Sequence, residues 1–274
     1  MILKWIFDRV VSLLGLLFLW PVLLVVAIMI KVKMPGGPVL FVQKRVGKDG
    51  KLFNCHKFRT MRVQSHIEST DNTEKAVLNT NDTNGTNASA GSATTGWSTV
   101  SVAGDSRITP LGAKLRHWKL DELPGLWDVF IGKMSFVGPR PDVPGYADKL
   151  TGDDRDVLKL RPGITGPATL KYRLEDEMIA EWVAQIRSHT ESTDNTERVV
   201  SKTNGTIHTN RLTQEEIDWM SDQEVAVWYN DNVIYPDKVR LNCYYYRHYS
   251  FVKDIQMILC TVLGKKMAYA GEEI

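Results

Sequence analysis

The feature that most constrains this chain is a long uncharged apolar run near its beginning. Between Arg9 and Lys31 lie 21 residues without a charge. A helix of that length, rising about 1.5 Å per residue, would match a hydrocarbon core of roughly 30 Å. Soluble core helices rarely contain such a run, and no small-residue cleavage site of the signal-peptide kind follows it. We therefore predict a retained membrane segment.

Pro21 lies near the middle of this run. A proline inside a helix removes a backbone donor and clashes with the preceding turn, which favours a kink. Basic residues flank both ends of the run, so neither end lacks the charges typical of the cytoplasmic side. They are Lys4, Arg9, Lys31, Lys33, Lys44, Arg45, Lys48 and Lys51. The pattern favours a hairpin that enters and leaves the membrane on one side; a kinked single span is the alternative.

Composition limits what the rest of the chain can be. Of its 274 residues 43% are hydrophobic, which is enough for one sizeable domain or two small ones. The formal net charge of +2 argues against bulk nucleic-acid binding. Three scattered cysteines are typical of a reducing compartment, and the six histidines have no two-ligand spacing on a helix. We expect neither a disulfide framework nor a zinc site.

Two nearly identical segments interrupt the chain. Residues 65 to 77 read SHIESTDNTEKAV and residues 188 to 200 read SHTESTDNTERVV, with ten of thirteen positions identical. Each continues into an Asn/Thr/Gly-rich stretch with too little apolar surface to offset the entropy of ordering. We interpret 65–101 and 188–211 as flexible surface insertions, with partner binding as an open alternative.

The remaining sequence predicts an α+β fold that is mostly helical. Alternation in 38–47 and 51–61, on either side of the turn KDGK, indicates a small β-hairpin. Apolar residues in 249–263 recur at helical spacing. That last helix either packs in the core or lies as an amphipathic helix in the membrane interface.

A further helix is predicted from TPLGAKLRHWKL, residues 109 to 120. Thr109 is a suitable N-cap residue, and proline suits the first helical position that follows it. At helical spacing, Leu111, Leu115 and Trp118 share one face.

An adjacent carboxylate pair, Asp121 and Glu122, follows this helix and precedes Pro124. If the pair ends the helix, both charges oppose the helix dipole and need a compensating cation. The position is therefore a weak indication of a metal. Taken alone, such a pair is more often a solvated helix end.

Basic side chains beside Gly or Pro give this pair a context. The planar guanidinium group suits phosphate oxygens, and tight loops hold it in position. The candidates for binding phosphate are Arg45, Lys57, Arg59, Arg116, Arg140 and Arg161. Carboxylates that hold Mg²⁺, together with arginines, are what a diphosphate substrate requires. Each arginine alone is more simply explained by a surface ion pair, whereas the set indicates a diphosphate site.

Six short motifs that follow the Pro-broken segment resemble the bacterial sugar transferases, monotopic phosphoglycosyl transferases that begin lipid-linked glycan assembly. In order they are QKRVG, KFRTM, LDELP, MSFVGPRP, RPGITG and FVKDIQMILCTV. They span nearly the whole chain outside the insertions. The resemblance implies an enzyme of the EC 2.7.8 type with a re-entrant helix hairpin broken at Pro21. It also implies a catalytic domain on the cytoplasmic face of the bacterial inner membrane.

The resemblance further implies a two-step reaction. Asp121 would attack the β-phosphate of a UDP-sugar, UMP would leave, and undecaprenyl phosphate would take the phosphosugar from the aspartate. Glu122 would hold Mg²⁺ with Asp121 or assist proton movement. The phosphate ligands would be Arg45, Lys57, Arg116, Arg140 and Arg161. The product would start an exopolysaccharide, capsule, O-antigen or glycoprotein glycan. Membrane lipid and downstream glycosyltransferases are the implied partners.

On this interpretation residues 1–35 form the membrane segment and 36–263 the interrupted catalytic domain, with 264–274 as a C-terminal tail. Two competing hypotheses stay open. One is a non-catalytic membrane-surface scaffold that recruits glycan-assembly enzymes through the insertions. The other is a single-span transferase that works without a covalent intermediate. The sequence does not choose among hexosamine and hexose donors.

Overall fold

The structure is a computed structural model that describes residues 2–62, 107–190 and 214–274. The helices are α1 (Ile2–Lys33), α2 (Pro110–His117), α3 (Gly125–Phe130), α4 (Pro167–Lys171), α5 (Glu175–Thr190), α6 (Gln214–Trp219), α7 (Asp222–Tyr229), α8 (Tyr235–Arg247) and α9 (Phe251–Leu263). The strands are β1 (Leu40–Val46), β2 (Leu52–Phe58), β3 (Ser135–Val137), β4 (Gly163–Thr165), β5 (Ala268–Tyr269) and β6 (Glu272–Glu273).

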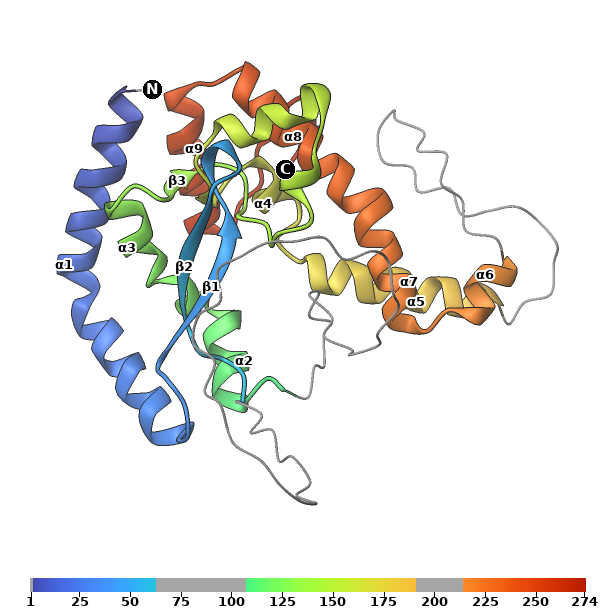
Figure 1. Ribbon diagram of the computed structural model, residues 1–274, viewed down its shortest axis with the longest axis horizontal. Helices are drawn as coiled ribbons and strands as arrows, with labels where there is room; N and C mark the ends of the chain where they lie inside the picture. Colours follow the sequence, from blue (N-terminus) through green and yellow to red (C-terminus); the bar gives the residue numbers. More distant parts are fainter. Residues whose placement is uncertain (1, 63–106, 191–213) are drawn as a thin grey trace, which may run out of the picture.

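Figure 1 shows α1 along one side of the molecule and α5, α6 and α7 on the other. The predicted mixture of helices and small sheets is confirmed. The first insertion, 65–101, and most of the second lie outside the described residues.

Helix α1 is a single helix that contains Pro21 in its interior. Figure 1 shows it bent, with its concave side toward the rest of the molecule. A proline removes one hydrogen bond and can bend a helix without ending it. The structure therefore does not show the predicted pair of helices joined by a turn.

Both ends of α1 pack on the same domain. Near its start, the ammonium of Lys4 lies 2.8 Å from Asp254 of α9, and Asp8 accepts a hydrogen bond from the backbone N–H of Phe136 at 3.1 Å. Near its end, Val26 and Ile30 belong to an apolar cluster. The other buried members of that cluster are Met34, Phe58, Leu111 and Leu115. The helix is thus held at two points, about 30 to 40 Å apart along its axis at 1.5 Å per residue.

The middle of α1 presents apolar side chains to the outside. Leu17 is 65% exposed and Phe18 83%. Among the described residues, α1 is the one helix with the length and apolar composition to cross a membrane, and only 11% of its most apolar stretch is buried. An exposed apolar surface of this size marks a contact with lipid or another protein. This exposed surface indicates that α1 associates with a membrane.

The contact between Lys4 and Asp254 gives a prediction about stability. Both side chains are buried, and the hydroxyl of Tyr245 also donates to Asp254 at 2.6 Å. Removing one partner of a buried ion pair leaves an uncompensated charge, at a cost of about 3–5 kcal/mol. We expect Lys4→Met to lower the Tm of the detergent-solubilised protein markedly, and Lys4→Met/Asp254→Leu to recover most of that loss. Additive losses in the double variant would contradict this.

The predicted β-hairpin is confirmed. Strands β1 and β2 pair antiparallel through the turn Lys48–Gly50, where Asp49 adopts a positive φ of 59°. In this register Gln43 lies opposite Cys55, and Arg45 lies opposite Phe53. Side chains alternate between the two faces of a strand, so Arg45 of β1 and Lys57 of β2 share one face of the hairpin.

The predicted helix at 109–120 is confirmed in its cap but not in its length. The hydroxyl of Thr109 accepts a hydrogen bond from the N–H of Gly112 at 2.9 Å, and Leu115 is buried. Trp118, which the pattern places on the face of Leu111 and Leu115, follows the last residue of the helix and is 71% exposed. Helix α2 ends at His117, and Lys119 adopts a left-handed φ of 53°.

Two of the sequence motifs meet in a parallel strand pair. Strand β3 comes from MSFVGPRP and β4 from RPGITG, with Ser135 opposite Gly163 and Val137 opposite Thr165. A Cβ added to Gly163 would collide with the backbone of Gly138, so a glycine is required for this close approach. The pairing fixes the loop after β3, which carries Arg140.

Core packing of the last helix is confirmed for one face of α9, and its position in the membrane interface stays a prediction. Asp254 and Met257 are buried, whereas Val252, Val262 and Leu263 are more than 60% exposed. Ring contact between Phe251 and Phe7, at a centroid distance of 5.5 Å, joins α9 to α1. The exposed apolar edge of α9 therefore adjoins the start of the membrane-type helix.

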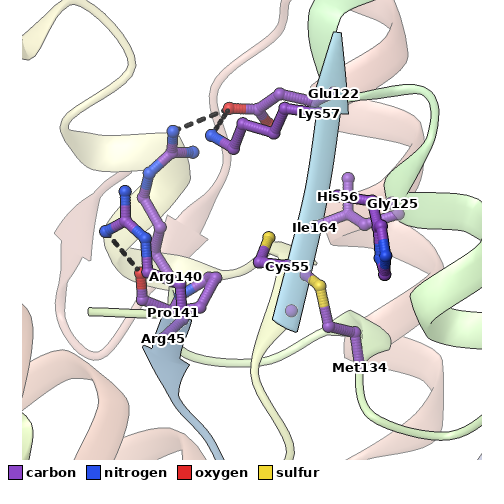
Figure 2. A pocket seen from close by; sticks show the side chains of 11 residues that line it. Arg45, Cys55, His56, Lys57, Glu122, Gly125, Met134, Arg140, Pro141 and Ile164 are labelled. Atoms are coloured by element: carbon purple, nitrogen blue, oxygen red, sulfur yellow. Dashed lines mark hydrogen bonds and ion pairs between the residues drawn. The ribbon is translucent and has the colours of Figure 1, made fainter. Parts of the chain in front are cut away.

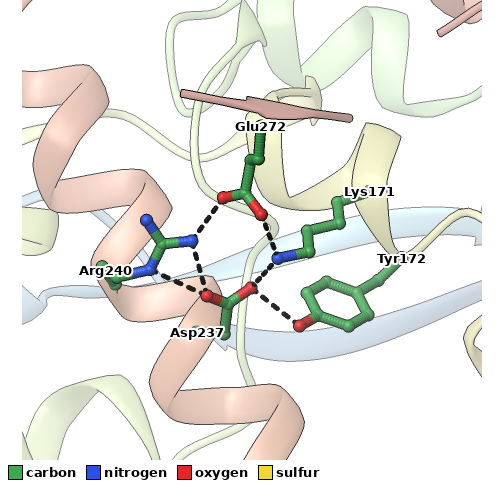
Figure 3. Close-up of polar contacts among 5 residues, drawn as sticks. All are labelled: Lys171, Tyr172, Asp237, Arg240 and Glu272. Atoms are coloured by element: carbon green, nitrogen blue, oxygen red, sulfur yellow. Dashed lines mark hydrogen bonds and ion pairs between the residues drawn. The ribbon is translucent and has the colours of Figure 1, made fainter. Parts of the chain in front are cut away.

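The final segment, 264–274, forms the β5–β6 hairpin and packs in the core, where Ile274 is 2% exposed. A network of polar contacts holds it there (Figure 3). The ammonium of Lys171 lies 2.6 Å from both Asp237 and Glu272, and Arg240 binds the same two carboxylates. The hydroxyl of Tyr172 donates to Asp237 at 2.8 Å. The network joins α4, α8 and the last hairpin, so this segment is part of the domain.

Candidate active site

Asp121 and Glu122 lie in a separate 3-10 turn, Leu120–Glu122, between α2 and α3. The expectation that they end a helix is wrong, because the left-handed backbone at Lys119 separates them from α2. Their charges do not extend the C-terminal end of that helix. The indication of a metal that rested on an unfavourable helix dipole is therefore withdrawn.

Glu122 is held by two cations. Its Oε1 accepts hydrogen bonds from Nζ of Lys57 at 3.1 Å and from Nη2 of Arg140 at 2.7 Å (Figure 2). Burial alone would raise the pKa of Glu122, but Arg140 and Lys57 outweigh it and hold that pKa well below its usual range. Glu122 in turn raises the pKa of Arg140. Glu122 and Arg140 are therefore both charged at neutral pH.

Asp121 has the opposite electrostatic character. Its residue is 8% exposed, and Oδ1 has no hydrogen-bond partner among the described residues. Burial, and next the charge of Glu122, raise the pKa of Asp121 above its usual value; Lys57 and Arg116 oppose the shift. The two neighbouring carboxylates thus differ. Glu122 is weakly basic and bound by two cations, whereas Asp121 is more basic and has an oxygen without a hydrogen-bond partner among the described residues. Such a separation of pKa values is typical of groups with different chemical roles.

The cavity beside the clamp is small and positively charged. Its lining consists of Arg45, Cys55, His56, Lys57, Glu122, Gly125, Met134, Arg140, Pro141, Gly163 and Ile164. It encloses about 30 Å³, and Figure 2 shows Lys57 and Arg140 extending across it toward Glu122. A diphosphate could occupy this space only by drawing these two side chains away from the carboxylate.

The structure brings some predicted site residues together and separates others. Arg45, Lys57, Glu122 and Arg140 line the cavity, and Arg45 is steadied there by a 3.2 Å hydrogen bond to the carbonyl of Pro141. Burial, and next the charge of Arg140, lower the pKa of Arg45. Because the cations Arg45 and Arg140 lie close together, the site is suited to a polyanion.

The other three predicted phosphate ligands lie outside the cavity. Arg116 donates to the hydroxyl of Thr60 at 3.0 Å, and its charge acts on Asp121. Arg59 is buried and donates to the carbonyl of Met34 beyond the end of α1. Arg161 lies 3.9 Å from Asp8 of α1. Arg59 and Arg161 thus contact the α1 segment instead of lining the cavity.

The sequence did not reveal a histidine–carboxylate contact beneath the site. Asp128 is fully buried; its Oδ2 accepts a hydrogen bond from the N–H of His56 at 2.9 Å, and its Oδ1 lies 2.7 Å from Nδ1 of the same residue. The two residues are 72 positions apart, so no local spacing signals them. The contact ties α3 to β2, and α3 directly follows the carboxylate pair.

A second carboxylate that sequence reasoning missed gives a prediction about pH. Asp142 follows Pro141 and accepts a hydrogen bond from the hydroxyl of Tyr235 at 3.2 Å. Burial raises the pKa of Asp142 to about 6. A carboxyl whose pKa is higher in the folded state stabilises the protein least above that pKa, because ionisation then favours the unfolded chain.

We therefore expect Asp142→Asn to raise the Tm at pH 7.5. The advantage should shrink as the pH falls from about 6 through 4, because the carboxyl is then protonated in the folded state and, at lower pH, in the unfolded chain as well. Thermal unfolding of parent and variant at several pH values measures this. A difference in Tm that does not change with pH would contradict it.

The residues at the site fit a magnesium ion that arrives with a substrate. No group of three or more His, Cys, Asp or Glu side chains gathers to hold a metal in the described parts of the chain. Mg²⁺, however, is commonly bound by one or two carboxylates together with substrate phosphates. The unpartnered Oδ1 of Asp121 suits that arrangement. Glu122 would contribute its oxygens only when its cations move toward the substrate.

Comparison with known proteins gives a consistent family. A family described as bacterial sugar transferase matches residues 1–199. An uncharacterized sugar transferase of Haemophilus influenzae is 39% identical over 60% of this chain and 32% of its own length. A UDP-glucose:undecaprenyl-phosphate glucose-1-phosphate transferase of Xanthomonas campestris pv. campestris is 34% identical over 58% of this chain and 28% of its own. The chain thus spans only about a third of these relatives.

A shorter relative matches over most of its length. The exopolysaccharide production protein PSS of Rhizobium leguminosarum bv. phaseoli is 38% identical over 62% of this chain and 74% of its own length. The residues 1–199 that match the family include Asp121 and every residue that lines the active-site cavity.

Proposed function

The chain belongs to the bacterial sugar transferase family, and from this premise we propose that it transfers a sugar 1-phosphate from a UDP-sugar to undecaprenyl phosphate. The donor and acceptor are those in the names of similar proteins, including an undecaprenyl-phosphate galactose phosphotransferase of Salmonella typhimurium. The observation that carries the proposal is the carboxylate pair itself. Glu122 is clamped by Lys57 and Arg140, while Asp121 beside it keeps an unpartnered oxygen and a raised pKa.

In the proposed first step, an oxygen of ionised Asp121 attacks the β-phosphorus of the UDP-sugar. The bond between that phosphorus and the bridging oxygen breaks, and UMP leaves with the electron pair. The aspartate then carries the sugar phosphate as an acyl phosphate. A raised pKa makes this carboxylate more basic, which helps a nucleophile as long as the pH keeps it ionised.

In the second step, an oxygen of the lipid phosphate attacks the same phosphorus. The bond to Asp121 breaks, the carboxylate is regenerated, and the product is a lipid diphosphate sugar. Covalent catalysis divides one difficult transfer into two, so donor and lipid need not occupy this small cavity together.

The cations of the cavity have a defined role in both steps. Lys57 and Arg140 neutralise Glu122 before substrate binds, and Arg45 lies in the same cavity. A diphosphate offers these groups stronger acceptors, so binding would transfer the two cations from Glu122 to phosphate oxygens. Once the two cations have moved to the phosphate, the pKa of Glu122 rises. Its carboxylate can then accept a proton and assist proton movement. Mg²⁺ held by Asp121 and Glu122 would supply further neutralisation of phosphate charge.

We also propose that the protein is monotopic on the cytoplasmic face of the bacterial inner membrane. Both ends of α1 pack on one domain, so α1 cannot lead to the opposite side of a bilayer while both contacts persist. The exposed middle of α1, with Leu17 and Phe18, would enter the bilayer, and the chain would return to the same side. Residues 36–274 would then form the catalytic domain beneath it, since the final hairpin packs in its core.

Labelling tests this topology. After replacement of Cys260, the partly exposed native cysteine, single cysteines are introduced as Ile2→Cys and Lys33→Cys. In intact cells an impermeant maleimide should modify neither, and after permeabilisation it should modify both. Modification of only one from outside would show a single span.

The function itself is tested by UMP release. Protein in nanodiscs is given a panel of UDP-sugars with Mg²⁺, with and without undecaprenyl phosphate, and with EDTA in a parallel series. We expect sustained UMP release from one donor, dependent on lipid and lost in EDTA. Folded protein that releases no UMP from any donor would favour a non-catalytic scaffold, and full activity in EDTA would exclude the magnesium role.

A further inference from the structure

A second hollow lies at the start of α1 and shares no lining residue with the active-site cavity. Its volume is about 590 Å³. Four segments line it: the first turn of α1, the β1–β2 turn, the loop between α3 and β3, and the loop that leads to β4. We call it the basic groove, after its cations Lys4, Lys48, Lys51, Lys133, Lys159 and Arg161. Asp49 is the one acidic side chain among the described residues that line it.

Three of the six cations of the basic groove are paired with a carboxylate. Lys4 is buried against Asp254, Lys159 lies 2.7 Å from Asp156, and Arg161 faces Asp8. The other three are exposed and form no ion pair with any residue of the described ranges; they are Lys48, Lys51 and Lys133. Ammonium groups gathered in a hollow without partners favour an anionic occupant.

One wall of the basic groove is apolar. Ile2 is 80% exposed, Trp5 48% and Leu52 53%, and all three line it. Ile2 and Trp5 belong to α1, whose outer surface is apolar along its length. A small soluble anion would leave these side chains in water. An amphiphile with an anionic head would cover them with its chains while its head meets the lysines.

We propose that the basic groove binds the headgroup of an anionic phospholipid. The phosphodiester lies among Lys48, Lys51 and Lys133, and the acyl chains run along Ile2 and Trp5 toward the apolar surface of α1. This site shares no lining residue with the active-site cavity. Its lysines Lys48 and Lys51 lie at the turn of the β1–β2 hairpin, whereas Lys57 lies near the other end of β2.

A lipid bound in the basic groove would restrain the hairpin as well as α1. The groove joins the first turn of α1 to the turn of the hairpin whose strands carry Arg45 and Lys57. A bound headgroup would therefore tie the hairpin to the membrane plane at a second point, beside α1 itself. The lipid orients the domain and takes no part in the chemistry.

Lipid retention tests the proposal. Full-length protein in a neutral maltoside detergent is titrated with phosphatidylglycerol or phosphatidylcholine, and native mass spectrometry counts the lipid retained. The groove variant is Lys48→Gln/Lys51→Gln/Lys133→Gln. The matched control removes the same charge from exposed lysines outside both cavities, as Lys114→Gln/Lys149→Gln/Lys265→Gln.

We expect the parent and the control to retain one phosphatidylglycerol in preference to phosphatidylcholine. The groove variant should bind it at least tenfold more weakly, because each lysine near an anionic lipid surface contributes about fivefold. Lys133→Gln alone should show a part of the loss and guards against misfolding of the triple variant. Asp121→Asn should retain the lipid as the parent does, which separates this site from the reaction.

Three results would overturn the proposal. Equal retention by groove variant and parent would remove the lysines from the site. Equal retention of phosphatidylcholine would remove the need for a negative headgroup. Displacement of the lipid by millimolar glycerol 3-phosphate would show that the groove selects a soluble phosphate and not a membrane lipid.

Discussion

In the variant Asp121→Asn we expect UMP release to fall on the order of 10⁴-fold or more, with any donor and with lipid present. Asp121 is the group that the proposed mechanism joins to phosphorus, and an amide cannot take that role. Its Oδ1 is the unpartnered oxygen of the pair, and the change removes a charge while it preserves the side chain's shape. Steady-state and single-turnover release of UMP in nanodiscs measure the loss.

Folding must be kept apart from chemistry in this variant. Burial raises the pKa of Asp121, so a neutral amide should cost the folded state nothing at neutral pH, and the Tm should be equal or higher. The matched control is Asp153→Asn, the same change at an exposed position. Retained UMP release by Asp121→Asn would remove Asp121 as nucleophile.

In the variant Arg140→Gln we expect kcat/KM for the UDP-sugar to fall about 10²- to 10³-fold. Arg140 makes the shorter of the two hydrogen bonds to Glu122 and is the cation that a diphosphate would take over. Its removal leaves Glu122 with Lys57 alone, so the pKa of Glu122 should rise because the larger opposing charge is lost. The charge of Arg140 also interacts with that of Asp121, so the pKa of Asp121 should rise as well. Because Asp121 must be ionised to attack, the acid limb of the pH–rate profile should move upward.

The comparison is with a guanidinium outside the site. Arg155 is exposed and donates to the carbonyl of Leu150 at 3.2 Å, so Arg155→Gln removes the same charge without touching the clamp. We expect it to keep the parental kcat/KM. An Arg140→Gln enzyme with unchanged kcat/KM and an unchanged acid limb would mean that the clamp has no part in the reaction.

Local patterns were sufficient for part of the fold. The β1–β2 hairpin follows from alternation around a turn, and the start of α2 follows from Thr109 at its cap. These features depend on neighbours in sequence, which is why a sequence can predict them. The left-handed residue Lys119 has no such signal, and it places the carboxylate pair outside α2.

The division of the arginines could not be predicted for a different reason. Arg59 and Arg140 belong to equally conspicuous motifs, yet one donates to the carbonyl of Met34 and the other reaches Glu122. Which anion or carbonyl an arginine meets depends on where α1 packs, and no spacing in the sequence gives that. The contact of His56 with Asp128 is another long-range feature of this kind.

The course of α1 is the largest difference between expectation and structure. Its two docking points were not foreseen, because Lys4 and Asp254 are 250 residues apart. They make the membrane segment part of the catalytic domain's packing. Arg59 and Arg161 add contacts to the α1 segment, through the carbonyl of Met34 and through Asp8.

In the proposed mechanism the sugar phosphate is bound to Asp121 between the two transfers. Mixing enzyme and UDP-sugar without any lipid acceptor isolates this intermediate, with UMP measured in the first turnover together with the intact mass of the protein. We expect a burst of UMP near one per enzyme, a mass increase of one sugar phosphate located on Asp121, and loss of both in Asp121→Asn. An enzyme that turns over with lipid, yet gives neither burst nor adduct without it, would exclude the covalent intermediate and favour direct transfer.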